Sequence, residues 1–151
     1  MAQTLLIRPA ERADAPIWER MRTALWPDES GSHSQDVARY FSGSRTNPLE
    51  VLVACPGSSV PVGFIELSIR PHAEGCTSDR VAFVEGWFVE AGHRGRGVGA
   101  ALMAAAEEWA RARQCTELAS DTQTFNEESI AAHNALGFEE VERLVCFRKS
   151  L

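Results

Sequence analysis

Hydrophobic residues recur along the chain with two periods, one typical of strands and one typical of helices. The clearest helix is predicted over Val98–Arg113, where the apolar residues form a single stripe. Two strand-like runs, Val51–Cys55 and Val62–Arg70, flank the turn sequence Pro-Gly-Ser-Ser and predict a hairpin. A further strand, Val81–Val89, is apolar almost throughout and carries a single carboxylate, Glu85. The pattern predicts a sheet followed by a long amphipathic helix.

Shorter patterns complete the order of elements. We expect further strands at Thr4–Arg8, Cys115–Ala119 and, as one or two strands, Phe138–Leu151, and further helices from the cap residue Asp14 to about Leu25, at Ser34–Phe41 and at Glu127–Leu136, which Gly137 ends. In the second strand of the hairpin, apolar residues alternate with Glu66, Ser68 and Arg70, which predicts a sheet with two unlike faces. This order predicts an α/β fold with a mixed sheet, in a single domain over residues 1–151.

Composition narrows the function classes. The formal net charge of −6 argues against a nucleic-acid partner, which needs clustered Lys and Arg, and fits a cationic substrate. No run approaches the roughly 20 apolar residues of a membrane span. The N-terminal residues lack the basic segment and long apolar run of a signal peptide, so we expect a cytoplasmic protein. The four cysteines are far apart, which predicts free thiols and no metal site.

A glycine- and arginine-rich loop joins the strand Val81–Val89 to the long helix. Its glycines let the backbone turn sharply and lie close to a ligand. The first turn of the helix adds unpaired N–H groups with a partial positive charge, and the two arginines add donors suited to phosphate oxygens. The loop therefore predicts a pyrophosphate site. The residues expected to bind the cofactor here are Arg94, Gly95, Arg96, Gly97, Val98 and Gly99.

Three known phosphate-binding schemes use such a loop. A P-loop is excluded, because Gly97 is followed by Val98 rather than by the required lysine. A dinucleotide fingerprint would use Gly95–Ala100, with Glu117 or Asp121 as the acid about twenty residues further on. That scheme expects a regular βαβ repeat, which the preceding hairpin interrupts.

The third scheme is the (Gln/Arg)-x-x-Gly-x-(Gly/Ala) loop of the GNAT acetyltransferase superfamily, which Arg94–Gly99 resembles. Other segments are similar to the small aminoglycoside 6′-N-acetyltransferases. They are Leu25-Trp26-Pro27, Phe83–Val89, Ala119–Thr122, His133–Glu140 and Phe147-Arg148-Lys149. The resemblance covers nearly the whole chain. It implies a mostly antiparallel sheet splayed at the acetyl-CoA site, direct transfer of acetyl to an aminoglycoside amine, antibiotic resistance and a homodimer.

The resemblance also implies roles for single residues. Glu85 would bind substrate or act as the general base; the alternative is a solvated carboxylate at a sheet edge. Asp121 would hold amino groups of the drug and assist their deprotonation; the alternative is a turn residue. His133 stands where many relatives carry a tyrosine as general acid, and the alternative is a structural histidine. Other members have a tyrosine where this chain has Phe147, and the only tyrosine here, Tyr40, lies in a different part of the chain.

The remaining expected site residues surround the reacting groups. A backbone N–H of Phe88 or Val89 would meet the thioester oxygen. Asn126, before the last predicted helix, joins the cofactor-binding residues. Trp26 would line the substrate side, and Asp28 would attract a polycation; the alternatives are a packing residue and a solvated turn.

Two other functions stay open. One keeps the same chemistry but takes a polyamine, a protein N-terminus or a small metabolite as the acceptor. The other is a sensor that binds acetyl-CoA without catalysis, which the replaced tyrosines favour and the retained Glu85 and Asp121 oppose.

Overall fold

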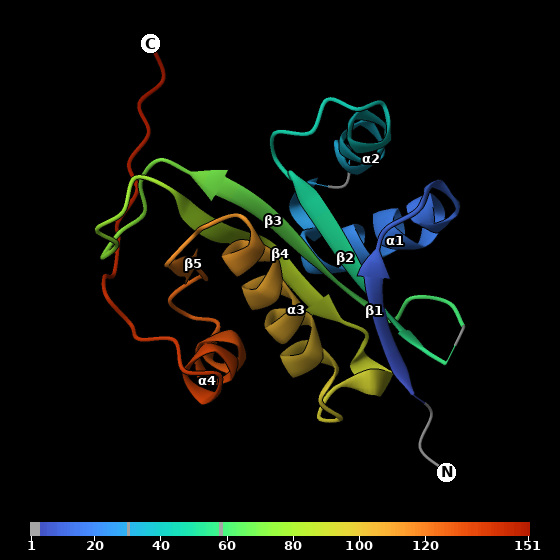
Figure 1. Cartoon of the computed structure of the whole chain (residues 1–151). Helices are drawn as coiled ribbons and strands as arrows, with labels where there is room; N and C mark the ends of the chain where they lie inside the picture. Colours follow the sequence, from blue (N-terminus) through green and yellow to red (C-terminus); the bar gives the residue numbers. More distant parts are fainter. Residues whose placement is uncertain (1–3, 30, 58) are drawn as a thin grey trace.

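A five-stranded sheet, in the order β1-β2-β3-β4-β5, runs through the molecule (Figure 1). The strands are β1 (Leu5–Pro9), β2 (Glu50–Pro56), β3 (Gly63–Arg70), β4 (Val81–Val89) and β5 (Leu118–Ser120). The first four are antiparallel and β5 runs parallel to β4, which confirms the predicted mixed sheet. The structure is a computed structural model that describes residues 4–29, 31–57 and 59–151; residues 1–3 of the N-terminal segment considered above lie outside this range.

Helices cover both faces of the sheet (Figure 1). The helices are α1 (Ala15–Leu25), α2 (His33–Phe41), α3 (Val98–Ala112) and α4 (Glu127–Ala135), with single 3-10 turns at Arg12–Asp14, Pro27–Glu29 and Ala91–His93. The first two helices pack on one face, whereas α3 packs on the other face with α4 beyond it. No helix among the described residues is long and apolar enough to cross a membrane.

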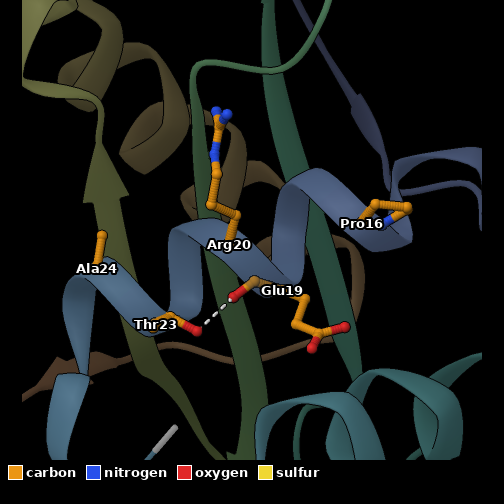
Figure 2. A pocket seen from close by; sticks show the side chains of 5 residues that line it. All are labelled: Pro16, Glu19, Arg20, Thr23 and Ala24. Carbon is orange, nitrogen blue, oxygen red and sulfur yellow. Dashed lines mark hydrogen bonds between the residues drawn. The ribbon is translucent and has the colours of Figure 1, made fainter.

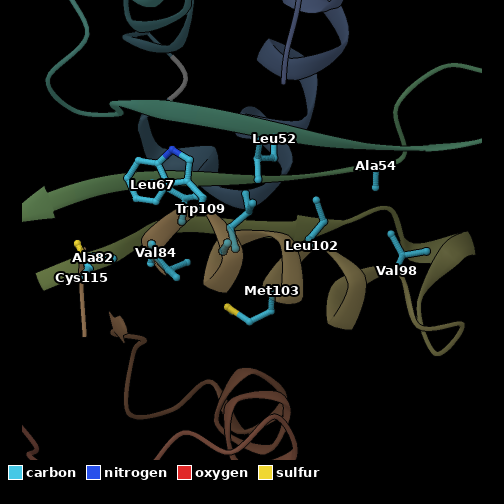
Figure 3. Packing of buried hydrophobic residues seen from close by; sticks show 13 residues of the cluster. Leu52, Ala54, Leu67, Ala82, Val84, Val98, Leu102, Met103, Trp109 and Cys115 are labelled. Carbon is cyan, nitrogen blue, oxygen red and sulfur yellow. The ribbon is translucent and has the colours of Figure 1, made fainter. Parts of the chain in front are cut away.

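The stripe predicted on the long helix forms the core on the α3 side of the sheet (Figure 3). Leu102, Ala106 and Trp109 are buried against apolar residues of the central strands. Each large apolar side chain buried in this way stabilises the fold by about 1.5–3 kcal/mol. Gly137 follows α4 with a φ of 89°, as expected for a glycine that ends a helix.

A second core lies between the sheet and the first two helices. Trp18 of α1 packs edge-on against Tyr40 of α2, with ring centroids 5.2 Å apart. The polar positions of β3 fall on this covered face, so Glu66 and Ser68 are buried rather than solvated. The two faces of the sheet thus differ as predicted, but the polar residues on one of them contact other protein groups rather than water.

Three local predictions were wrong. Phe138–Leu151 forms no strand, because no other strand of the described chain lies alongside it to complete a ladder. β5 begins at Leu118 rather than Cys115, because only Leu118–Ser120 pair with β4. Asp14 precedes α1 but does not cap it: its carboxylate accepts hydrogen bonds from Arg8 and from the N–H of Glu11.

An irregularity between β3 and β4 shapes the site. The register shifts between Glu66 and Leu67, which leaves Glu85 as the extra residue of a β-bulge in β4. Beyond the bulge, β4 continues to Val89, whereas β5 has already ended opposite Val84. The last part of β4 therefore has an open edge on the side away from β3.

Candidate active site

The glycine-rich loop has the geometry of an anion site. Gly95 and Gly97 adopt φ angles of 73° and 83°, and a Cβ on either would meet no atom within 4 Å. Gly97 is the N-cap of α3 and has no side chain, so no N-cap side chain occupies the N–H groups of the first turn. This loop fits the pyrophosphate of coenzyme A, because the ligand can approach the backbone and meet free donors.

Two arginines and the start of α4 surround the loop. Arg94 donates from Nε to the carbonyl oxygen of Val89 (2.8 Å), and its guanidinium lies 5.7 Å from the ring centroid of Phe88. Its Nη1 lies 3.9 Å from a carboxylate oxygen of Glu128, which brings the loop close to the N-terminal end of α4. Arg96 is exposed. Asn126 caps α4 by accepting from the N–H of Ser129, which leaves its amide N–H₂ for a ligand.

The open edge of β4 distinguishes the two residues expected to meet the thioester. Glu90 donates its N–H to Val62 on the β3 side, and Phe88 pairs with Phe64 of β3 in the same register. Because backbone groups of successive strand residues point to opposite sides, the N–H of Val89 faces the opening. The N–H of Phe88 belongs to the sheet, so Val89 is the better donor to a thioester oxygen.

Glu85 is neither free nor solvated. Its carboxylate accepts two hydrogen bonds from Arg70, from Nε (2.9 Å) and from Nη2 (2.7 Å), and a third from the hydroxyl of Ser68. The Glu85 side chain is 13% exposed, against 39% for Arg70. Oε1 accepts two of these hydrogen bonds and Oε2 accepts one, so Oε2 can accept one more.

Asp121 lies next to Glu85 at the same end of the sheet. Val84 stands opposite Ser120 in the parallel pair, so Glu85 and Asp121 are the next residues along the two strands. Asp121 is exposed. The hydrogen bonds from Arg70 to Glu85, together with the charge of Asp121, raise the pKa of Arg70. The fold thus brings together the two carboxylates that the sequence assigned to substrate binding.

Trp26 lies over β4 beside these carboxylates. A Cβ on Gly86 would lie 2.5 Å from Cη2 of Trp26, so only glycine admits the indole at this position. The residue is half-buried, which agrees with both the substrate-lining and the packing interpretation. Asp28 is exposed in the 3-10 turn that follows Trp26.

A buried ion network that the sequence did not predict lies against Trp26. Arg22 donates from Nη1 to both oxygens of Glu66 (2.6 Å each) and from Nη2 to Asp36 (2.8 Å). Its Nε donates to Nδ1 of His33 (3.2 Å), which fixes the proton of that ring on Nε2, 3.0 Å from the carbonyl oxygen of Trp26. Burial raises the pKa of Glu66, and the charge of Arg22 opposes that rise. The alternating polar residues of β3 were the only sequence signal for this network.

His133 is held by the fold through both ring nitrogens. Nδ1 donates to the carbonyl oxygen of Ser129 (2.7 Å), so Nε2 accepts from the hydroxyl of Ser120 (2.8 Å). The ring also packs edge-on against Trp87 and Phe138, at 5.2 and 5.1 Å. These contacts favour the structural interpretation, and the role of general acid stays a prediction.

The only tyrosine does not replace the missing general acid. Tyr40 is buried between α2 and the sheet, where its hydroxyl donates to Glu50 (3.0 Å) and accepts from the N–H of Val51 (3.2 Å). Burial and the charge of Glu50 raise the pKa of Tyr40 to about 12. Its hydroxyl is therefore a structural group.

A shallow hollow of about 570 Å³ lies along the outer face of α1 (Figure 2). It is lined by Pro16, Glu19, Arg20, Thr23 and Ala24. Arg20 also pairs with Glu90 (3.1 Å), so the hollow lies beside the end of β4. It contains neither the phosphate loop nor Glu85 and Asp121, and we assign it no ligand.

A glycine-rich anion loop at a helix N-terminus, beside a mixed sheet that splays open, defines an acetyl-CoA-dependent N-acetyltransferase. Residues 18–138 match the model of the acetyltransferase (GNAT) family, and the chain belongs to this family. It is 49% identical to the aminoglycoside N(6′)-acetyltransferase type 1 of Klebsiella aerogenes, over 100% of both chains. It is 39% identical to the enzyme of the same name from Stenotrophomonas maltophilia, over 100% of this chain and 97% of that one.

A solved structure of AAC(6′)-Iy in complex with the bisubstrate analogue CoA-S-monomethyl-acetylneamine is also similar. It superposes with a TM-score of 0.87 at 35% identity, over 98% of this chain and 99% of that chain.

Replacing Gly97 with Glu is expected to weaken coenzyme A binding by about 100-fold, since the new side chain is strained at positive φ and places a carboxylate in the anion site. Calorimetric titration with coenzyme A measures the effect. Gly43→Glu is the matched control, because Gly43 has a φ of 97° and open space around it but lies after α2. Equal affinity in Gly97→Glu and the wild type would show that the loop does not bind the pyrophosphate.

Proposed function

We propose that the chain transfers the acetyl group of acetyl-CoA to the 6′-amine of an aminoglycoside and thereby confers resistance to the drug. One observation carries the proposal: Glu85 and Asp121 emerge next to each other at the opening of the sheet that the phosphate loop borders. A polycationic acceptor needs paired carboxylates at this place. The names of the relatives at 49% and 39% identity agree with this substrate class.

The reaction requires an uncharged amine beside the thioester carbonyl. In our proposal Asp121, directly or through water, takes a proton from the 6′-ammonium, while Glu85 holds the sugar through the free capacity of Oε2. The amine nitrogen then bonds to the carbonyl carbon, the carbon–sulfur bond breaks, and coenzyme A leaves as a thiolate, while the second proton of the attacking nitrogen passes to water to leave a neutral amide. The N–H of Val89 donates to the carbonyl oxygen as negative charge develops on it. A thiol with a pKa near ~8.5 leaves readily, so the mechanism does not depend on His133.

The test is thiol release from acetyl-CoA by the purified protein with a panel of amines. We expect turnover of kanamycin-type drugs with a 6′-amine and none of matched drugs with a 6′-hydroxyl. Turnover of spermidine or short peptides alone would move the acceptor to another class. Coenzyme A binding with no turnover on any amine would instead indicate a sensor.

We further propose that the enzyme works as a homodimer in the cytoplasm. The C-terminal arm, residues 139–151, is exposed throughout and carries several large apolar side chains. They are Val141, Leu144, Val145, Phe147 and Leu151. β5 pairs on one edge only within the described chain, and a hollow of about 540 Å³ beside it is lined in part by Leu118, Leu136 and Phe138. The arm of a second copy would cover this edge. Four free thiols agree with a reducing compartment.

Replacing both Val145 and Phe147 with Asp is expected to raise the dimer dissociation constant by about 100-fold or more, because each apolar side chain contributes about 1.5–3 kcal/mol when buried. Sedimentation at several concentrations measures it. Val60→Asp is the control, because Val60 is also exposed (61%) but lies in the β2–β3 loop. A wild type that sediments as a monomer would contradict the dimer.

A further inference from the structure

Arg70 occupies a position that the proposed reaction does not use. It is the last residue of β3, and its guanidinium lies 3.5 Å from the ring centroid of Phe83 on the neighbouring strand β4. From there it reaches both oxygens of Glu85. The contact is a parallel two-point pairing, the strongest form of arginine–carboxylate interaction.

Several carboxylates converge on this one guanidinium. Glu85 contacts it directly, and the charges of Asp121 and Glu74 add to the rise in the pKa of Arg70. Two of these carboxylates, Glu85 and Asp121, are the ones assigned to the cationic acceptor. The protein thus already holds one cation of its own among the groups that would bind an ammonium.

We propose that Arg70 is a specificity-determining residue that acts as an internal substitute for a substrate ammonium, so that a cationic acceptor competes with it for Glu85. This inference rests on the proposed function, because it concerns the same carboxylates. In the free protein the guanidinium neutralises the desolvated Glu85. A bound acceptor that uses the free capacity of Oε2 meets a like charge there, and it gains a further contact with Glu85 when it takes over one of the two hydrogen bonds from Arg70. An acceptor with several ammonium groups can gain from Asp121 and Glu74 together, whereas a monoamine cannot.

The partial exposure of Arg70 makes this exchange feasible. Its side chain is 39% exposed, so water can solvate the guanidinium when it leaves Glu85. Glu85 has much less access to water and keeps Ser68 as a fixed donor. The carboxylate therefore stays in place while its cationic partner changes.

The experiment is calorimetric titration of kanamycin, and separately of spermidine, into the protein saturated with coenzyme A. Arg70→Gln is expected to lower the dissociation constant of each cation by about 3- to 10-fold, the size expected for removing one partly screened like charge. Arg70→Lys keeps the charge without the two-point geometry and is expected to bind as the wild type does. Arg80→Gln is the matched control, because Arg80 donates to the carbonyl oxygen of Arg113 and does not contact Glu85.

Thermal unfolding of each variant verifies that it is folded. Weaker or unchanged cation binding by folded Arg70→Gln would overturn the inference and make Arg70 a positioning residue for Glu85. Absence of binding to every variant would overturn it as well. If the wild type does not turn over 6′-amino drugs but Arg70→Gln binds cations more tightly, the proposed function fails and this inference stands.

Discussion

Asp121→Asn and Glu85→Gln are each expected to lower kcat/KM for a 6′-amino aminoglycoside by about 10²- to 10⁴-fold, the usual range for loss of a positioned acid or base. Both changes keep the size of the side chain and remove its charge. Neither residue contacts the phosphate loop, so affinity for coenzyme A should stay the same. Thiol release and calorimetry with coenzyme A measure the two quantities.

The surroundings of the two carboxylates predict that the two substitutions affect different kinetic parameters. Asp121 is exposed and forms no ion pair within the described residues, so it is the better proton acceptor and its loss should fall mainly on kcat. Glu85 is engaged by Arg70 and Ser68, so its loss should fall mainly on KM. Glu108→Gln serves as the control, because Glu108 pairs with Arg111 on the exposed side of α3. Near-full turnover in either carboxylate variant would remove the role assigned to that residue.

Arg22→Met is expected to lower the free energy of unfolding by about 3–5 kcal/mol, because it leaves the charge of buried Glu66 without its partner. In a chain of this size the loss corresponds to a fall in Tm of roughly 10 °C. Urea unfolding gives the free energy. Arg39→Met is the matched control: Arg39 pairs with Asp36 at the surface and is 54% exposed, so its loss should cost about 1 kcal/mol or less.

The pH dependence of Arg22→Met gives a second measurement of the same effect. Burial already raises the pKa of Glu66 above its unfolded value, and without Arg22 the rise should be larger. A folded state with the higher pKa binds protons more readily, so it gains stability relative to the unfolded state as pH falls. The difference between Arg22→Met and the wild type should therefore shrink from pH 7 towards pH 5. The double variant Arg22→Met, Glu66→Leu should recover much of the loss in stability. A loss that is equal at pH 7 and at pH 5, and that persists in the double variant, would show that the ion pair is not its cause.

The sequence by itself determined the elements and the loop whose causes are local. α3, β4 and the loop Arg94–Gly99 were predicted nearly to the residue, because helical and strand periods and the conformational freedom of glycine act within a few positions. The Glu85 and Asp121 assignments came from the resemblance to known acetyltransferases. Their adjacency came from the parallel pairing of β4 and β5.

Only the tertiary structure decided which groups are partners. Arg22 and Glu66 are 44 residues apart in sequence, and no local pattern indicates that packing α1 on β3 joins them in one buried ion pair. Likewise, the choice of Val89 over Phe88 depends on the register of β4 with β3. The C-terminal arm shows the same limit, because alternating residues form a strand only where another strand lies alongside them, and that placement is a property of the tertiary structure.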